Sequence, residues 1–177
     1  MSGILRFIGI INAAIWFGAG VFFAAGILPA VFSQEMHTLF RETGASSPYS
    51  GAVALLLFKR FFLLQYICGT VAVLHLLAEK LYLGRTLSRF WTALVVIIFG
   101  LGLLGGLALQ PRMENLRHTM YAGRTQEQRD QARHSFGLWH GISEFTNLLI
   151  IGGLLAHLVR VTRPADPGRY GTFYQIP

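Results

Sequence analysis

The chain has 177 residues, of which 53% are hydrophobic and only 13% are charged. A soluble domain carries about 25% charged residues because its surface faces water, so this composition excludes an ordinary soluble protein and indicates a lipid-facing surface. The net charge of +7 does not indicate nucleic-acid binding, since the basic residues are spread over loops between apolar runs and form no single face. The single cysteine, Cys68, lies inside an apolar run, which excludes a disulfide framework and a thiolate metal cluster.

Four apolar runs are long enough to cross a hydrocarbon core of about 30 Å, which needs about 20 helical residues. The runs lack the alternating pattern of barrel strands, so each is predicted to be a helix. The first run is longer than the apolar region of a signal peptide, and we expect it to be a retained anchor. The sequence therefore predicts an all-α polytopic membrane protein with four antiparallel transmembrane helices in one domain, residues 1–161, followed by a polar C-terminal tail, residues 162–177. The predicted spans are residues 4–31, 61–78, 90–109 and 136–158.

The loops between the runs are unequal in length. Residues 79–89 join the second and third runs, which makes those two helices antiparallel neighbours. The other two loops are long, and each carries apolar residues at helical spacing, so we expect a short interfacial helix in each. Gly44 is expected to end the first of these, and Ser47 with Pro48 to begin the next helix. The apolar stripes are Phe32, Met36, Leu39 and Phe40 in the first loop and Met113, Leu116 and Met120 in the second.

The fourth helix is predicted to begin well before its membrane-spanning part. Thr125 and Gln128 fit a capping box after Gly123, and a continuous helix is expected from there to His157. An even number of crossings leaves both termini on one side of the membrane. Basic residues are denser, and lie in shorter segments, on that side, so the positive-inside rule predicts cytoplasmic termini in an integral membrane protein, located in the inner membrane if the source is bacterial.

The fourth run carries the most informative polar residues. His140, Glu144 and Asn147 are spaced i, i+4 and i+7, which puts them within about 60° on one helix face, and Ser143 lies beside them. An ionised carboxylate near mid-span costs about 2.5–3.5 kcal/mol, so Glu144 is predicted to face the bundle. We expect a buried polar stripe on this face.

Two interpretations of the stripe remain open. It could be a buried hydrogen-bond network, in which Glu144 bonds to His140 or to Asn12 or Gln65 of neighbouring helices. It could instead bind or conduct a proton, a cation or a small polar ligand, because ionisable residues inside a membrane are functional candidates by default. The candidate ligand-binding residues are Asn12, Gln65, His140, Ser143, Glu144 and Asn147.

Several motifs occur in a recognisable order along the chain. They are Pro29-x-x-Phe32 after the first run, residues 58–66 at the start of the second, Pro111-Arg112-Met113 with Arg117 after the third, and His140-Gly141-x-Ser143-x-x-x-Asn147-Leu148-Leu149 in the fourth. In this order the chain resembles the TMEM205-like family, also called DUF4149, over most of its length up to about His157. The resemblance implies a four-helix membrane protein, and the family has no settled biochemical activity. Glu144 departs from the pattern, because an apolar or small residue is usual there.

A non-catalytic accessory or scaffold subunit of a membrane complex is the main alternative function. The amphipathic loop helices and the aromatic tail fit a protein that packs against a membrane-protein partner or a second copy of itself. Two glycine pairs, Gly102 with Gly106 and Gly137 with Gly141, predict close helix contacts, mainly inside the bundle. A hydrated cavity reaching Glu144 would favour binding or transport, whereas a dry and fully paired stripe would favour a structural role.

Two other functions fit less well. A bis-His haem-binding electron carrier would use His75 and His157, but His157 lies about 80–100° from the polar stripe, so we expect it at the side of the bundle or near the headgroups. An enzyme is not expected, because Ser143 has no recognisable nucleophile elbow or oxyanion donors. The sequence identifies no cofactor, and the partner it requires is the lipid bilayer. Metal-site spacing is not found among the loop histidines His37, His118 and His134.

Overall fold

The computed structural model describes residues 2–42, 49–83 and 88–163, and all of its regular elements are helical. The predicted all-α class is thereby confirmed. Several predictions fall outside the described residues. They concern residues 164–177 of the predicted tail, the helix end at Gly44, and the helix start at Ser47 and Pro48. The elements are α1 (Ser2–Phe22), the π-helical turn η1 (Phe23–Ile27), α2 (Leu28–Val31), α3 (Gln34–Glu42), α4 (Tyr49–Leu83), α5 (Arg89–Leu104), the π-helical turn η2 (Gly105–Leu109), α6 (Gln110–Ala122) and α7 (Gln126–Thr162).

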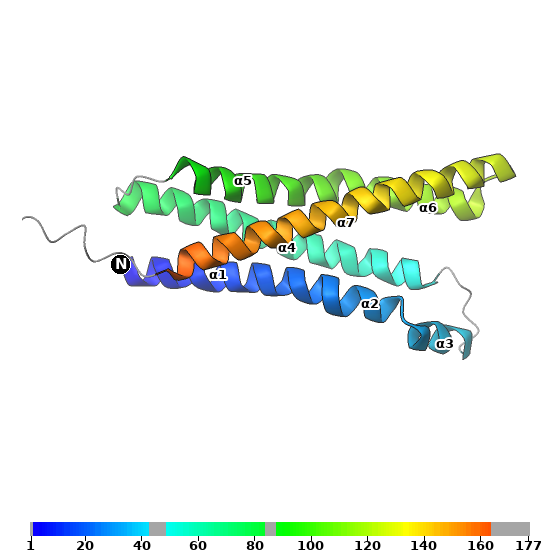
Figure 1. The fold of residues 1–177 in the computed structure, drawn as a ribbon, viewed down its shortest axis with the longest axis horizontal. Helices are drawn as coiled ribbons and strands as arrows, with labels where there is room; N and C mark the ends of the chain where they lie inside the picture. Colours follow the sequence, from blue (N-terminus) through cyan, green and yellow to red (C-terminus); the bar gives the residue numbers. More distant parts are fainter. Residues whose placement is uncertain (1, 43–48, 84–87, 164–177) are drawn as a thin grey trace, which may run out of the picture.

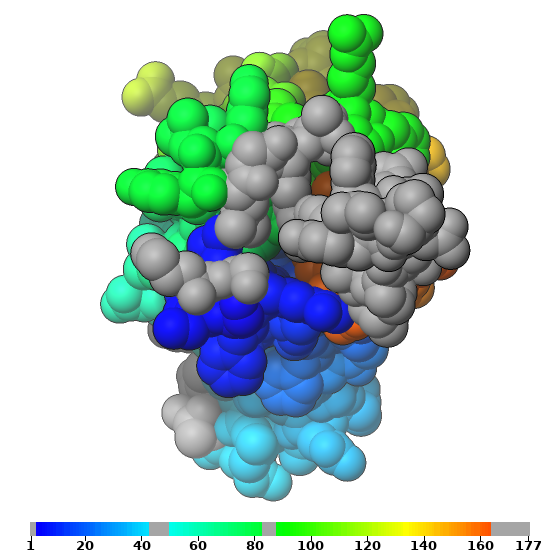
Figure 2. Space-filling model, turned by 90° about the vertical axis from the view of Figure 1, so that its left-hand side faces the viewer, coloured from blue at the N-terminus to red at the C-terminus, as the bar shows by residue number. Residues whose placement is uncertain are grey.

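Four helical rods of the described chain are long and apolar enough to cross a membrane. They are Gly3–Val31, Ser50–Tyr82, Arg89–Ala122 and Gln126–Thr162. Figure 1 shows them lying side by side, with the start of α1 and the end of α7 at one end, which we call the terminal end. The other end, which holds α3 and the α6–α7 turn, is called the loop end. Seen from the terminal end, the start of α1, the start of α5 and the end of α7 all come into view (Figure 2).

The rods pack in a closed ring rather than a flat row. Helix α1 contacts both α4 and α7, and α5 likewise contacts both α4 and α7. The predicted pairing of the second and third spans corresponds to the contact of α4 with α5. Of the two predicted interfacial helices, α3 is a separate short helix. Helix α6 is not separate, because it continues the third spanning rod through η2. At the start of α7, the Thr125 side chain accepts a hydrogen bond from the Gln128 N–H at 3.2 Å, as predicted. The return bond of the predicted capping box is shifted by one residue, because the Gln128 side chain accepts from the Arg124 N–H instead of the Thr125 N–H.

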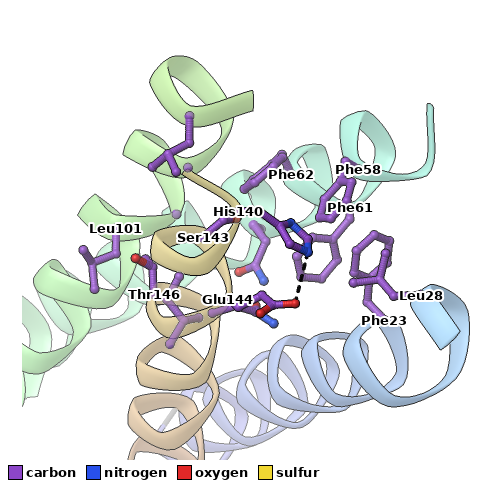
Figure 3. Close-up of a pocket in the computed structure, with 16 residues that line it drawn as sticks. Phe23, Leu28, Phe58, Phe61, Phe62, Leu101, His140, Ser143, Glu144 and Thr146 are labelled. Atoms are coloured by element: carbon purple, nitrogen blue, oxygen red, sulfur yellow. Dashed lines mark ion pairs between the residues drawn. The ribbon is translucent and has the colours of Figure 1, made fainter. Parts of the chain in front are cut away.

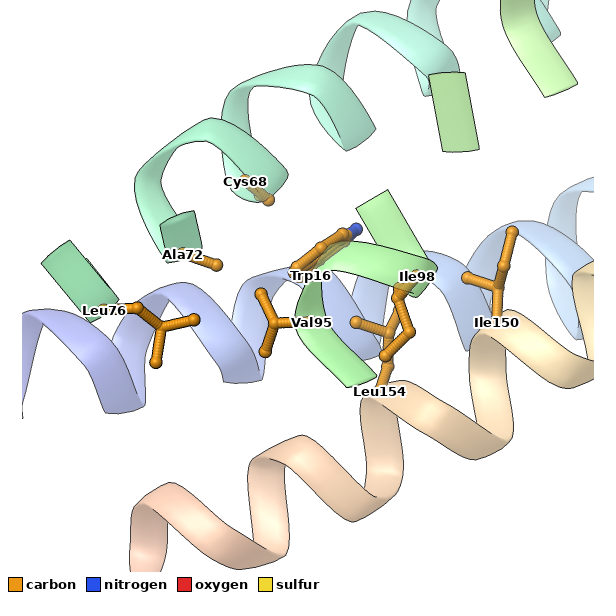
Figure 4. Close-up of a cluster of buried hydrophobic side chains, with 8 residues drawn as sticks. All are labelled: Trp16, Cys68, Ala72, Leu76, Val95, Ile98, Ile150 and Leu154. Atoms are coloured by element: carbon orange, nitrogen blue, oxygen red, sulfur yellow. The ribbon is translucent and has the colours of Figure 1, made fainter. Parts of the chain in front are cut away.

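The main hydrophobic cluster, drawn in Figure 4, is formed by residues from the half of the bundle near the terminal end. Trp16, Val95 and Leu154 are the largest fully buried side chains, and they come from α1, α5 and α7. The indole N–H of Trp16 donates to the side-chain oxygen of Gln65 on α4, so its polar group is satisfied inside the core. Because lipid tails are as apolar as these side chains, close packing rather than transfer from water holds the helices together. The cluster consists of Trp16, Cys68, Ala72, Leu76, Val95, Ile98, Ile150 and Leu154.

Glycines allow close approach at only some of the predicted positions. A Cβ at Gly69 on α4 would overlap the Phe99 ring of α5, and one at Gly106 would overlap the Tyr66 side chain. In contrast, Cβ atoms at Gly137 and Gly141 would meet nothing within 4 Å, and the same holds for Gly102. The predicted close helix contact is therefore found for Gly106 but not for the other three. Gly102 is buried without a neighbour this close, whereas Gly137 and Gly141 are exposed.

Two π-helical turns precede the two prolines that lie within spanning rods. Proline has no N–H to donate, and its ring clashes with the carbonyl four residues earlier, so the helix must rearrange just before it. In η1 the Leu28 N–H bonds to the Phe23 carbonyl, one residue before Pro29. In η2 the Gln110 N–H bonds to the Gly105 carbonyl, one residue before Pro111. Both turns lie on the loop-end side of the core (Figure 1).

Candidate functional site

The polar stripe of α7 is brought together as predicted, but it is not buried. Nε2 of His140 lies 3.2 Å from Oε1 of Glu144, and the two side chains are 54% and 68% exposed. This corrects the prediction of a buried stripe. The physical reason is that α1 and α4 stand away from this part of α7, so the pair faces a cavity instead of a neighbouring helix (Figure 3).

The cavity has two adjoining parts. The inner lobe, of about 90 Å³, is lined by Gln65, Ser143, Glu144 and Asn147 among other residues. The outer lobe, of about 670 Å³, extends towards the loop end as far as Ser50. The two lobes meet at residues that line both, namely Leu28, Phe58, Phe62, Gly105, Leu109, His140, Ser143 and Glu144. The outer lobe lies within the range of about 300–1,000 Å³ that is typical of small-molecule sites.

Aromatic side chains form the wall opposite the polar pair. The ring of Phe23 stacks on that of Phe61 with centroids 4.2 Å apart, and it meets Phe58 edge-on at 4.9 Å. Figure 3 shows these rings, with Leu28, on the side to which His140 and Glu144 point. This aromatic wall was not predicted from the sequence. Two features of the sequence could have indicated it. Three phenylalanines are closely spaced within residues 58–62, and Phe23 lies six residues before Pro29, where a π-helical turn places its ring beside them.

Five of the six predicted site residues line the inner lobe, and one does not. Asn12 instead donates from its amide to the Cys68 carbonyl at 3.0 Å, which joins α1 to α4 outside the cavity. Gln65 lines the lobe, but it is 3% exposed and its side-chain oxygen accepts from Trp16. The predicted partner that Glu144 meets is therefore His140 rather than Asn12 or Gln65.

Charged and aromatic contacts mark the level of the membrane surface at the loop end. Nζ of Lys59 lies 3.5 Å from Oε2 of Glu114, and the Arg112 guanidinium lies 5.2 Å from the ring centroid of Trp139. Tryptophan and basic side chains gather at the membrane interface. Glu144 lies five residues beyond Trp139 along α7, which is about 7.5 Å into the apolar span. The cavity thus extends from the level of Glu144, within the apolar span, to the loop end of the bundle.

The second pair of histidines lies at the opposite end of the bundle. His75 and His157 are 9% and 3% exposed, so the prediction that His157 lies at the side of the bundle or near the headgroups is wrong. Nε2 of His75 lies 2.9 Å from the Leu5 carbonyl, and a Cβ at Gly9 would lie 2.6 Å from the same nitrogen. One ligating nitrogen is thus engaged and the ring is packed against α1, which argues against haem. Within the described residues, no group of three or more His, Cys, Asp or Glu could hold a metal ion.

A family model described as "Domain of unknown function (DUF4149)" matches residues 11–122. The match covers more than half of the chain, which belongs to this family. Comparison with curated proteins and with solved structures gave no match. The matched segment contains the aromatic wall and both π-helical turns, whereas the stripe of α7 lies beyond it. The narrower resemblance to TMEM205-like proteins stays a prediction.

Proposed function

We propose that this DUF4149 protein is a non-catalytic membrane protein that binds a small ligand in its cavity, and that the His140–Glu144 pair contacts a cationic or hydrogen-bond-donating part of that ligand. One observation carries the proposal: an ionisable pair within the apolar span opens into a cavity, with more than half of each side chain exposed.

The position of the pair favours binding over a purely structural network. A carboxylate placed in a membrane only to join helices would be enclosed by its partners, since an unpaired charge there is costly. Glu144 has one partner, on its own helix one turn away, and contributes no bond between helices among the described residues. Ser143 and Asn147 add donors and acceptors beside it, and the phenylalanine wall provides apolar contact. This mixture is typical of small-molecule sites.

The packing favours binding over conduction through the membrane. Ile150 both lines the inner lobe and belongs to the hydrophobic core. Beyond it the bundle is filled by Trp16, Val95 and Leu154, all of which are nearly inaccessible. A proton or cation that entered from the loop end would meet this apolar plug. We therefore propose a site that is open towards the loop end and closed towards the terminal end.

The test is binding of a lipophilic cation, tetraphenylphosphonium, to the full chain in nanodiscs of zwitterionic phosphatidylcholine. The wild type is expected to bind it saturably, and Glu144→Gln to bind it at least about tenfold more weakly, because a charge-assisted contact is lost while the shape is kept. Glu114→Gln is the matched control, since Glu114 is an exposed carboxylate at the membrane surface and does not line the cavity. Equal binding by the wild type and Glu144→Gln would overturn the proposal.

A further inference from the structure

We infer that the outer end of the cavity is an anion-binding site, and that its ligands are anionic amphiphiles that carry a carboxylate or a phosphate on an apolar chain. The inference rests on the proposed function in one respect, that the same cavity receives the ligand. The residues that carry it are different and lie at the start of α4 and on α6.

The first observation is a buried hydroxyl without a partner. Ser50 is 3% exposed and lines the outer lobe, and its Oγ has no hydrogen-bond partner among the described residues. The side-chain nitrogen of Gln110, which lines the same lobe, is likewise buried without a partner there. Buried polar atoms are almost always hydrogen-bonded, so two such groups in one cavity indicate that a ligand supplies the missing partner. Both groups can donate, and an anion accepts.

The second observation is positive potential at the same place. Ser50 lies in the first turn of α4, a helix of 35 residues, where backbone N–H groups and the helix dipole favour an anion. The Arg117 guanidinium packs directly on Gly51, and a Cβ at Gly51 would lie 2.8 Å from Cζ of Arg117. A guanidinium has five N–H donors, so it can contact an anion in addition to its other interactions. Arg117 and His37 both line the lobe at this end.

The third observation is the apolar path that leads from this end. Between Ser50 and Glu144 the outer lobe is lined mainly by apolar side chains of α2, α4 and α6. Ser50 lies nine residues before Lys59 on α4, which places it about 13.5 Å closer to the loop end along the helix axis. A bound amphiphile would hold its anionic group at this outer end and extend its chain along the apolar lining towards the inner lobe. The apolar lining includes Phe32, Leu55, Phe58, Phe62, Met113 and Met120.

The main test compares anionic and zwitterionic lipids of identical acyl chains. Full-length protein is reconstituted in nanodiscs that contain equal amounts of phosphatidylglycerol and phosphatidylcholine, and the lipids it retains are measured by native mass spectrometry. The wild type is expected to retain the anionic lipid preferentially. Arg117→Gln should reduce that preference about tenfold, because a charge-assisted contact is lost. Arg133→Gln, at an exposed arginine that does not line the cavity, should keep it.

Gly51→Ala provides a second variant that keeps every charge and every donor. Its added Cβ would displace the Arg117 guanidinium, so it should reduce the preference as well, while alanine favours the helix. A preference that survives in both Arg117→Gln and Gly51→Ala would overturn the inference. So would a wild type that retains the two lipids equally.

Melting curves separate the possible sources of the anion. Oleate is expected to raise the melting temperature of the wild type but not that of Arg117→Gln. A phospholipid of the same charge should have the same effect on the two proteins. If inorganic phosphate alone gave the same Arg117-dependent rise, the site would bind free anions and the amphiphile class would be wrong. Glu144→Gln should keep the lipid preference, so failure of the proposed function would appear in tetraphenylphosphonium binding alone. Failure of this inference would appear in the lipid retention of the wild type and of the Arg117→Gln and Gly51→Ala variants, with tetraphenylphosphonium binding unchanged.

Discussion

The two halves of this bundle are built from the same four rods and yet differ in how they are filled. Near the terminal end, Trp16 and Leu154 are closed in by neighbours from three other helices, and Gly69 lets α4 and α5 approach closely. Near the loop end the rods border a cavity of about 670 Å³ that is lined by Ser50 and Gln110. Buried polar atoms of these two residues lack partners in the described chain, as does Nδ1 of His157 at the terminal end. The packed half is filled by side chains, whereas the open half contains the cavity.

The position of proline explains much of this difference. In the packed half the rods have no proline, so their backbones stay regular and their surfaces fit together. Pro29 and Pro111 both fall in the open half, and each is preceded by a π-helical turn. Such turns change the direction of the side chains that follow them and are frequent at functional sites. Residues of both turns, among them Ala24 and Gly105, line the cavity.

The largest expected effect lies in the packed half, at Trp16. Trp16→Ala should destabilise the protein by about 3–5 kcal/mol, because it leaves a cavity in the core and removes the donor to Gln65. The measurement is the melting curve of the purified protein in detergent, followed by circular dichroism. Phe145→Ala, at an outward-facing ring that is 64% exposed, should change stability far less. Equal losses in the two variants would contradict the distinction between a packed half and a lipid-facing surface.

A smaller effect is expected where the helices approach most closely. Gly69→Ala should lower stability by about 1–3 kcal/mol, because the added methyl group forces α4 away from the Phe99 ring. Gly141→Ala adds the same group to α7 where nothing lies within 4 Å, and it should be neutral or stabilising by up to about 1 kcal/mol. Both variants can be compared in one denaturant titration. A Gly69→Ala protein as stable as the wild type would show that α4 and α5 separate easily.

The smallest expected effect is at the polar pair in the open half. A buried network would make Glu144→Leu strongly destabilising, but a side chain that opens into a cavity can be replaced with a change of less than about 0.5 kcal/mol. Thermal melts of the wild type and Glu144→Leu in the same detergent measure the difference. If Glu144→Leu lowered the free energy of unfolding by several kcal/mol, the polar stripe would have a structural role, and the contrast between the two halves would not hold.

Local patterns in the sequence carried most of the fold and part of the site. Apolar length predicts the four spans, Thr125 and Gln128 predict the start of α7, and the spacing of His140 and Glu144 predicts their contact, since each depends on residues within one helix. What depends on the arrangement of several helices was not predictable. Asn12 was assigned to the site although its partner is a backbone carbonyl of α4.

The burial of His157 was also not predictable from one helix alone. The prediction for His157 assumed that α7 has a single inward face along its whole length, the face that carries His140. Helix α7, however, contacts α6, α5 and α1 along its length, and it crosses the bundle obliquely (Figure 1). Its inward face therefore rotates from one end to the other, and residues 17 positions apart can both point inwards although a helical wheel separates them.

The contact between α1 and α7, which closes the ring of four rods, also has a consequence for the order of assembly. Arg6, in the first turns of the chain, donates to the Thr162 and Arg163 carbonyls at 3.4 and 3.0 Å, at the end of α7. Those carbonyls are among the ones that a helix leaves unpaired at its C-terminus. A nascent chain inserts α1 first, yet one side of that helix has no partner until the last span has left the ribosome and entered the bilayer. Without α7, one side of Trp16 and its neighbours would face the lipid, so α7 is the element that completes the ring.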